Sequence, residues 1–176
     1  MQSQNLQKTV TAALLCAVVF VFTFLSIPMG IGNVNLGDGA LLLTAWTLGG
    51  PWAVVSAALG AALADLASGY AIYAPATFVI KAAMVAAALL VLRLLSNAKL
   101  SVRIRRLLSA VAAELVMVLG YLIYEATLLG YGAGALVSVP FNAVQGLVAV
   151  AVSGLLYEAL SRVGILSKNQ RFGPKK

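Results

Sequence analysis

The sequence predicts an all-α membrane protein with six transmembrane helices and both termini in the cytoplasm. Hydrophobic residues make up 62% of the chain, charged residues make up 10%, and the mean hydropathy is +1.00. A soluble domain carries about 25% charged residues. The 176 residues suit six spans of about 20 residues with short connections. We therefore expect a single membrane domain over residues 1–176, and the distribution of basic residues, described below, supports six spans.

Apolar runs bounded by glycine, proline or charged residues define the six expected helices. Gln7 to Ile27 forms the first, ended by Pro28 and Gly30, and we interpret it as a retained helix rather than a cleaved signal. A polar, glycine-rich loop over 28–37 then leads into a short second helix. The six expected helices cover residues 7–27, 38–48, 52–67, 75–95, 107–129 and 139–160.

Basic residues occur only at alternate connections between these spans. The basic segments are Lys8, 93–106 and 162–176, and the connections without Lys or Arg are 28–37, 68–74 and 130–138. The positive-inside rule places the basic segments, and with them both termini, in the cytoplasm. The second helix is short, since about 11 residues barely cross a core of about 30 Å. We keep it as a tilted or partly buried span because the alternation requires it.

Several classes of chemistry are excluded by composition. The chain contains no histidine and one cysteine, Cys16, so His-dependent triads, HExxH zinc sites, Cys clusters and an intramolecular disulfide are all absent. It has no G-x-x-x-x-G-K-[ST] loop for ATP hydrolysis. The basic residues that give the net charge of +7 cluster between apolar spans, where they orient the chain in the bilayer. We therefore expect no nucleic-acid binding. We expect no enzyme activity, metal or cofactor.

Polar residues gather near the end of the bundle that carries the uncharged connections. Four ionisable residues, Asp38, Asp65, Lys81 and Glu125, fall in this half, although an ionisable group inside a membrane costs about 2.5–3.5 kcal/mol. Helical spacing places Thr77 with Lys81, Tyr121 with Glu125, and Asn142 with Gln145, each pair on one helix face. The predicted substrate-binding residues are Asn35, Asp38, Asp65, Tyr70, Tyr73, Lys81, Tyr121, Tyr124, Glu125, Asn142 and Gln145.

Aromatic walls with a few placed hydrogen-bonding groups are typical of a small-molecule pocket, and a flat heteroaromatic ligand would suit this one. The alternative is that Lys81 pairs with Glu125 or Asp65 to hold helices together, while the tyrosines form an interfacial belt. Asp38 equally suits the N-cap of the second helix. Glu114 lies nearer the basic side, and we expect it to be separate from the cluster, with a structural or partner-facing role.

Small residues recur at four-residue spacing in two of the helices. In the third helix they are Ala53, Ala57 and Ala61, and also Ser56, Gly60 and Ala64. Such spacing favours close packing between helices. Ala13 and Ala17 form a second small patch on the first helix, nearer the cytoplasmic side, where it could receive a partner helix.

Three stretches resemble the substrate-binding S components of energy-coupling factor (ECF) vitamin transporters. They are Asn35-Leu36-Gly37-Asp38, Ala64-Asp65-Leu66-Ala67-Ser68-Gly69-Tyr70 through Pro75 and Lys81, and Asn142-Ala143-Val144-Gln145-Gly146. The resemblance covers nearly the whole chain, and the stretch between the third and fourth helices is its most specific part.

The resemblance implies a non-enzymatic binding subunit in the bacterial plasma membrane. Such a subunit holds a vitamin or precursor near the outer face and docks on a membrane scaffold subunit driven by two cytoplasmic ATPases. It implies that Ala13 and Ala17 contact the scaffold and that Asn33 and Asn35 belong to a lid. The motifs most resemble the hydroxymethylpyrimidine or pyridoxine branch, with riboflavin next. A self-sufficient small carrier is the alternative, although no internal repeat is found.

Overall fold

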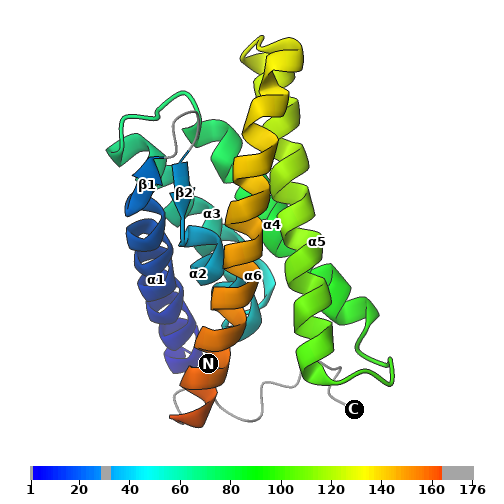
Figure 1. The fold of residues 1–176 in the computed structure, drawn as a ribbon. Coiled ribbons are helices and arrows are strands. Elements are labelled where there is room, and N and C mark those ends of the chain that lie inside the picture. Colours follow the sequence, from blue (N-terminus) through cyan, green and yellow to red (C-terminus); the bar gives the residue numbers. More distant parts are fainter. Residues whose placement is uncertain (1, 29–32, 164–176) are drawn as a thin grey trace.

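The computed structural model describes residues 2–28 and 33–163 of the chain, and its described part is mainly helical (Figure 1). The helices are α1 (Gln2–Phe24), α2 (Gly37–Thr47), α3 (Gly50–Ala67), α4 (Ala74–Leu94), α5 (Val102–Ile123) and α6 (Val139–Arg162). A π-helix, Tyr124–Leu128, extends α5, and a 3₁₀ helix, Gly132–Ser138, leads into α6. Two short strands, β1 (Ser26–Pro28) and β2 (Asn33–Asn35), pair antiparallel.

The chain runs back and forth between two ends of the bundle. The N-terminal turns of α1, the connection 95–101 and the last turn of α6 lie at one end, which we call the basic end (Figure 1). The β1–β2 ribbon and the connections 68–73 and 129–138 lie toward the other, which we call the uncharged end. The described parts of the basic segments therefore share one end, as the alternation of charge predicts.

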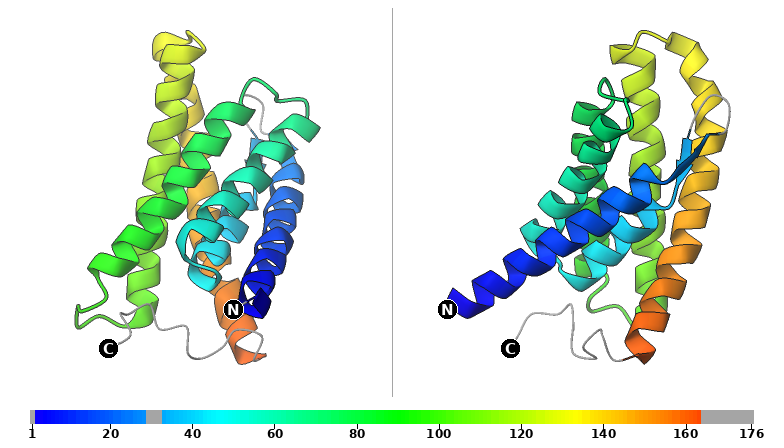
Figure 2. Two further views of the ribbon diagram at one scale, coloured as in Figure 1. Left: turned by 180° about the vertical axis from the view of Figure 1, so that it is seen from behind. Right: turned by 90° about the vertical axis from the view of Figure 1, so that its left-hand side faces the viewer.

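The five long helices form an open ring, and α2 fills the gap between α1 and α6. Contacts link α1 with α3, α3 with α4, α4 with α5, and α5 with α6, while α2 packs against α6 and α1. The views from behind and from the side show α5 and α6 standing next to each other, with α1 slanting across the opposite side (Figure 2). Elements far apart in sequence therefore meet around α2.

The short second helix is a core element. Every residue from Gly37 to Trp46 is buried, and apart from Asp38 and Thr44 these residues are apolar, as expected of a segment enclosed by protein. Among the described residues, five helices are long and apolar enough to span a membrane: Asn5–Phe24, Gly50–Ala67, Ala74–Leu94, Val102–Leu128 and Gly132–Arg162. The prediction of six spanning helices is thus supported for five of them, and α2, with 11 residues, lies inside the bundle.

Several predicted boundaries were wrong for local reasons. The first helix runs from Gln2 to Phe24 rather than from Gln7 to Ile27, and residues 26–28 pair with residues 33–35 of the segment 28–37, which was expected to be a loop. Residues 29–32 of that segment lie outside the described part. The fifth helix begins at Val102 rather than residue 107, since Ser101 caps it by accepting the Ile104 N–H at 3.3 Å. The expected loop over 130–138 is mostly 3₁₀ helix.

Close packing of α1 against α3 depends on a small residue at position 60. A Cβ added to Gly60 would lie 2.4 Å from the carbonyl oxygen of Cys16 and 3.1 Å from Cβ of Val19. The two backbones therefore approach more closely than any side chain allows, as the four-residue spacing of small residues predicts. Ala13 and Ala17 lie on exposed positions of α1, away from this contact.

Candidate functional site

The centre of the polar region is an ion pair between α2 and α4. Lys81 Nζ donates to Oδ1 of Asp38 at 2.5 Å, and Nε2 of Gln145 in α6 donates to Oδ2 of the same carboxylate at 2.6 Å. Asp38 is 1% exposed and Lys81 4%. A buried charge is tolerated only when it is paired and hydrogen-bonded, so these three side chains fix one another's positions.

The β-ribbon is tied to the same group of residues. The Asn35 N–H donates to Oε1 of Gln145 at 3.1 Å, and the Gly37 N–H donates to Oδ1 of Asn35 at 2.9 Å. Asn35 thus supports the start of α2. The alternative that Asp38 is the N-cap of this helix is wrong, because Asp38 lies inside the first turn and its carboxylate faces Lys81. We call Asn35, Asp38, Lys81 and Gln145 the polar core.

Aromatic and hydroxyl groups line the α4 and α5 side of the polar core. Lys81 Nζ lies 5.4 Å from the ring centroid of Tyr121, a distance suited to a cation–π interaction. The Tyr121 hydroxyl shares a hydrogen bond of 2.9 Å with the Thr77 hydroxyl, one turn before Lys81. Asp65, at the end of α3, is half-buried beside Thr77. Thr77 and Lys81 therefore both face Tyr121 from one side of α4.

Glu114 also belongs to this region, contrary to expectation. Its side chain is 6% exposed, and neither carboxylate oxygen has a hydrogen-bond partner within the described residues. A Cβ added to Gly146, next to Gln145, would lie 3.2 Å from Glu114 Oε2, and Glu114 is close enough to Asp38 and Lys81 to interact with them electrostatically. The sequence did carry a signal for this position of Glu114, because helical periodicity places Glu114 and Tyr121 two turns apart on one face of α5.

A second polar group lies nearer the uncharged end. Glu125 accepts a hydrogen bond from the Ser138 hydroxyl at 2.5 Å and contacts the Tyr73 hydroxyl at 3.5 Å. The Tyr73 ring packs edge-on against Tyr70 and Tyr124, with centroids 6.5 and 5.6 Å away. Burial, with the nearby Glu125 carboxylate, raises the pKa of Tyr73 above its usual value, so its phenol stays protonated. We call Tyr70, Tyr73, Tyr124 and Glu125 the outer tyrosine cluster.

The predicted residues therefore separate into two connected groups. Lys81 pairs with Asp38, so the alternative pairing with Glu125 or Asp65 is wrong. Asn142, in the first turn of α6, is half-buried, and its side chain makes no hydrogen bond within the described residues. Asn142, Asp65 and Tyr121 belong to neither the polar core nor the outer tyrosine cluster.

The side chains of this site could bind a ligand through hydrogen bonds and charge. The polar core offers a carboxylate, an ammonium and two amides within an apolar bundle, and the carboxyl group of Glu114 lies beside it; a few polar groups in apolar surroundings are usual for a small-molecule site. Among the described residues, no group of three or more His, Cys, Asp or Glu is placed to hold a metal. The fold and the site together define a multi-pass membrane protein with a buried cluster of charged and amide side chains.

Comparison with known proteins then identifies the family. Residues 3–162 match the family model of the S component of the ECF-type riboflavin transporter, and the chain belongs to that family. It also shares its fold with a solved chain described as "Structure and mechanism of the S component of a bacterial ECF transporter", at 24% identity and a TM-score of 0.67, covering 91% of this chain and 98% of that one. No curated protein matches. Members of this family are transporter subunits, not enzymes.

Proposed function

We propose that this chain is the substrate-capture subunit of an ECF-type importer and that the polar core binds its substrate. The observation that carries the proposal is the buried Lys81–Asp38 pair with Gln145 on the second carboxylate oxygen. An intramembrane charge cluster is costly and marks a functional site by default. The family implies a vitamin substrate, a membrane scaffold subunit and two cytoplasmic ATPases as partners.

The substrate we favour is a single-ring pyrimidine or pyridine of the hydroxymethylpyrimidine or pyridoxine type. Ring nitrogens and exocyclic amino or hydroxyl groups would pair with the amide of Gln145, the Lys81–Asp38 pair and the carboxyl of Glu114. The Tyr121 ring beside Lys81 offers a face for stacking. Each group lies within one compact region between α2, α4, α5 and α6.

Riboflavin is the second candidate, favoured by the description of the matching family model. A three-ring flavin needs a longer site, and the outer tyrosine cluster would extend the polar core along α4 and α5. The two candidates therefore predict different contacts. A single-ring ligand would depend on the polar core with Tyr121 and Glu114, whereas a flavin would depend on the aromatic rings of the outer tyrosine cluster as well.

A thermal-shift panel on detergent-purified protein tests the proposal. The panel holds hydroxymethylpyrimidine, pyridoxine, riboflavin, thiamine and pantothenate. A ligand at about 100 times its Kd stabilises the folded state by about 2.7 kcal/mol, so the substrate should give a clear upward shift in Tm. Lys81→Met should abolish the shift, while Lys99→Met, which removes an exposed lysine in the connection 95–101, should keep it.

Two results would count against the proposal. No shift with any compound would contradict vitamin capture, and an equal shift in Lys81→Met would place binding elsewhere. Proteoliposomes separate the capture subunit from a self-sufficient carrier. The reconstituted chain alone should bind its ligand without accumulating it, and concentrative uptake without partners would favour the carrier.

A further inference from the structure

Away from the polar core, a cleft of about 370 Å³ lies between α5 and α6 toward the basic end. Apolar side chains form much of its wall, and Ile104, Leu107 and Leu155 on its rim are exposed. Trp46 of α2, only 1% exposed, lines its inner side. The cleft is of a size typical of small-molecule sites, and nothing in the proposed function uses it.

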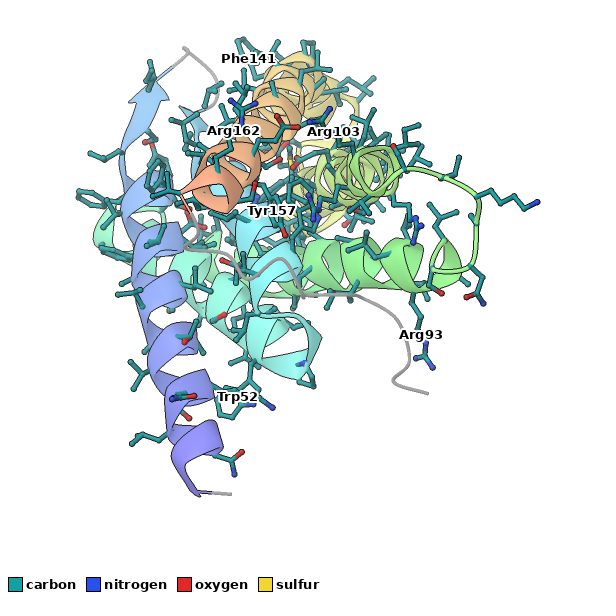
Figure 3. The ribbon with its side chains drawn as sticks, turned by 90° about the horizontal axis from the view of Figure 1, so that it is seen from below. Trp52, Arg93, Arg103, Phe141, Tyr157 and Arg162 are labelled. Carbon is teal, nitrogen blue, oxygen red and sulfur yellow. The ribbon has the colours of Figure 1, made fainter. Side chains whose placement is uncertain are left out.

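Arginine side chains surround the end of this cleft. Arg103 and Arg106 line it, and Arg162 lies at the end of α6 beside them. Seen from below, Arg103, Arg162 and Tyr157 gather where α5 and α6 meet, while Arg93 lies apart on α4 (Figure 3). Glu158 pairs with Arg103 at 2.8 Å and with Arg162 at 3.8 Å. Three arginines thus face one carboxylate, and positive charge is in excess.

Arg106 is held in a position that leaves it able to bind an anion. Its guanidinium carbon stacks 3.4 Å above the Tyr157 ring centroid, and its buried Nε has no hydrogen-bond partner within the described residues. A buried donor without an acceptor is costly, so an incoming oxygen ligand would satisfy it. Stacking also orients the planar guanidinium, which reduces the entropy lost on binding.

The polar and apolar parts of the cleft follow one another along α5 and α6, with the arginines nearest the basic end. Arg103 lies at the start of α5, and Ala110 on the same cleft wall lies seven residues deeper, about 10 Å along the helix. Val150 and Ala151 of α6 continue the apolar wall. A ligand filling this cleft would place a negative group against the arginines and a hydrocarbon segment toward the bilayer centre.

We propose that this cleft binds an anionic phospholipid from the leaflet at the basic end of the bundle. The arginines would hold the phosphodiester, and the apolar wall would hold the first part of an acyl chain. Arginine favours phosphate oxygens through charge-assisted hydrogen bonds, and basic pockets between transmembrane helices bind acidic headgroups. This site is independent of the substrate bound by the polar core.

Tryptophan fluorescence gives a direct test, because the chain has two tryptophans and Trp46 lines the cleft. Trp52, exposed on α3, is removed by Trp52→Phe. The variant is reconstituted in vesicles containing phosphatidylglycerol or phosphatidylcholine with brominated acyl chains at equal mole fraction in unlabelled phosphatidylcholine. Brominated phosphatidylglycerol should quench Trp46 more strongly. Equal quenching by both lipids would overturn the proposal.

Charge variants in the same background then assign the effect to the cleft. Arg106→Gln should lower the preference for phosphatidylglycerol about fivefold, and Arg93→Gln, an exposed arginine on α4, should leave it unchanged. Glu158→Gln should raise the preference, because it removes the carboxylate that pairs with Arg103. This gain cannot come from misfolding. An equal loss in Arg93→Gln, or no gain in Glu158→Gln, would overturn a specific site.

A soluble competitor distinguishes a lipid from a simple anion. Inorganic phosphate and glycerol phosphate carry the same oxygen ligands without acyl chains. Neither should relieve the quenching by brominated phosphatidylglycerol when total ionic strength is held constant with chloride. If millimolar phosphate abolishes the difference between the two lipids, the arginines bind a free anion and the lipid proposal fails.

Discussion

Lys81 Nζ lies 2.5 Å from Oδ1 of Asp38, although 43 residues separate the two in sequence. This bond joins α4 to the buried helix α2, and Gln145 of α6 completes it on the other carboxylate oxygen. Three elements of the ring therefore meet at one charged point. We propose that the stability of the bundle and the binding of its ligand both depend on this ion pair, and suitable variants separate the two effects.

Lys81→Met should destabilise the protein by about 3–5 kcal/mol, because it leaves the Asp38 carboxylate buried without its counter-charge. The double variant Asp38→Asn, Lys81→Met removes both charges and should recover most of the lost stability. Ligand binding should stay lost in both. Thermal unfolding in detergent and a binding assay measure the two effects, and a fully stable single variant would show that the pair is unimportant.

Glu114→Gln should keep the fold and weaken ligand binding about tenfold, equivalent to about 1.4 kcal/mol. The carboxyl group has no hydrogen-bond partner within the described residues, so replacing it by an amide of similar size breaks no hydrogen bond and should not lower the Tm. Titration calorimetry with the ligand found in the panel measures the affinity. Unchanged affinity together with a lower Tm would instead indicate a purely structural role.

Ser138→Ala should lower stability by about 1–3 kcal/mol, because it leaves an oxygen of the buried Glu125 without its donor. The polar core is untouched, so affinity for a single-ring ligand should be unchanged. Tyr73→Phe is the companion variant, since it removes only the long contact to Glu125. If both variants weaken binding, the outer tyrosine cluster belongs to the ligand site, as a flavin would require.

Gly60→Ala should destabilise the bundle by about 1–3 kcal/mol, the usual range for overpacking. The new methyl group would collide with the backbone of α1 at Cys16, which cannot move aside as a flexible side chain can. Gly154→Ala in α6 is the matched control, because nothing lies within 4 Å of its added Cβ and alanine favours helix. Comparable losses of Tm in both variants would contradict this account.

The orientation of the bundle is open to direct measurement with single cysteines. In a Cys16→Ala background, Ser68→Cys at the uncharged end should react with a membrane-impermeant maleimide on intact cells. Asn97→Cys in the basic connection 95–101 should react only after the membrane is permeabilised. The expectation follows from the positive-inside rule, and the reverse pattern would show that the basic end faces outward.

Much of the fold followed from hydropathy and charge. Long apolar runs between glycine and proline residues predicted the five long helices within a few residues, since those signals act locally. The β-ribbon and the early start of α5 were missed. The ribbon depends on pairing between Ser26–Pro28 and Asn33–Asn35, and the start of α5 depends on the cap at Ser101. A hydropathy pattern records neither strand pairing nor helix capping.

The sequence by itself determined that this chain is a membrane protein, that its basic segments alternate, and that its polar residues concentrate toward one end. The reason is that the cost of placing charge in hydrocarbon acts on each residue separately. Only the tertiary structure decided which charges meet. It paired Lys81 with Asp38 rather than with Glu125 or Asp65, and brought Glu114 to the same region. Ion pairs depend on distances of a few ångströms between helices, and those distances are set by how α2 packs inside the ring.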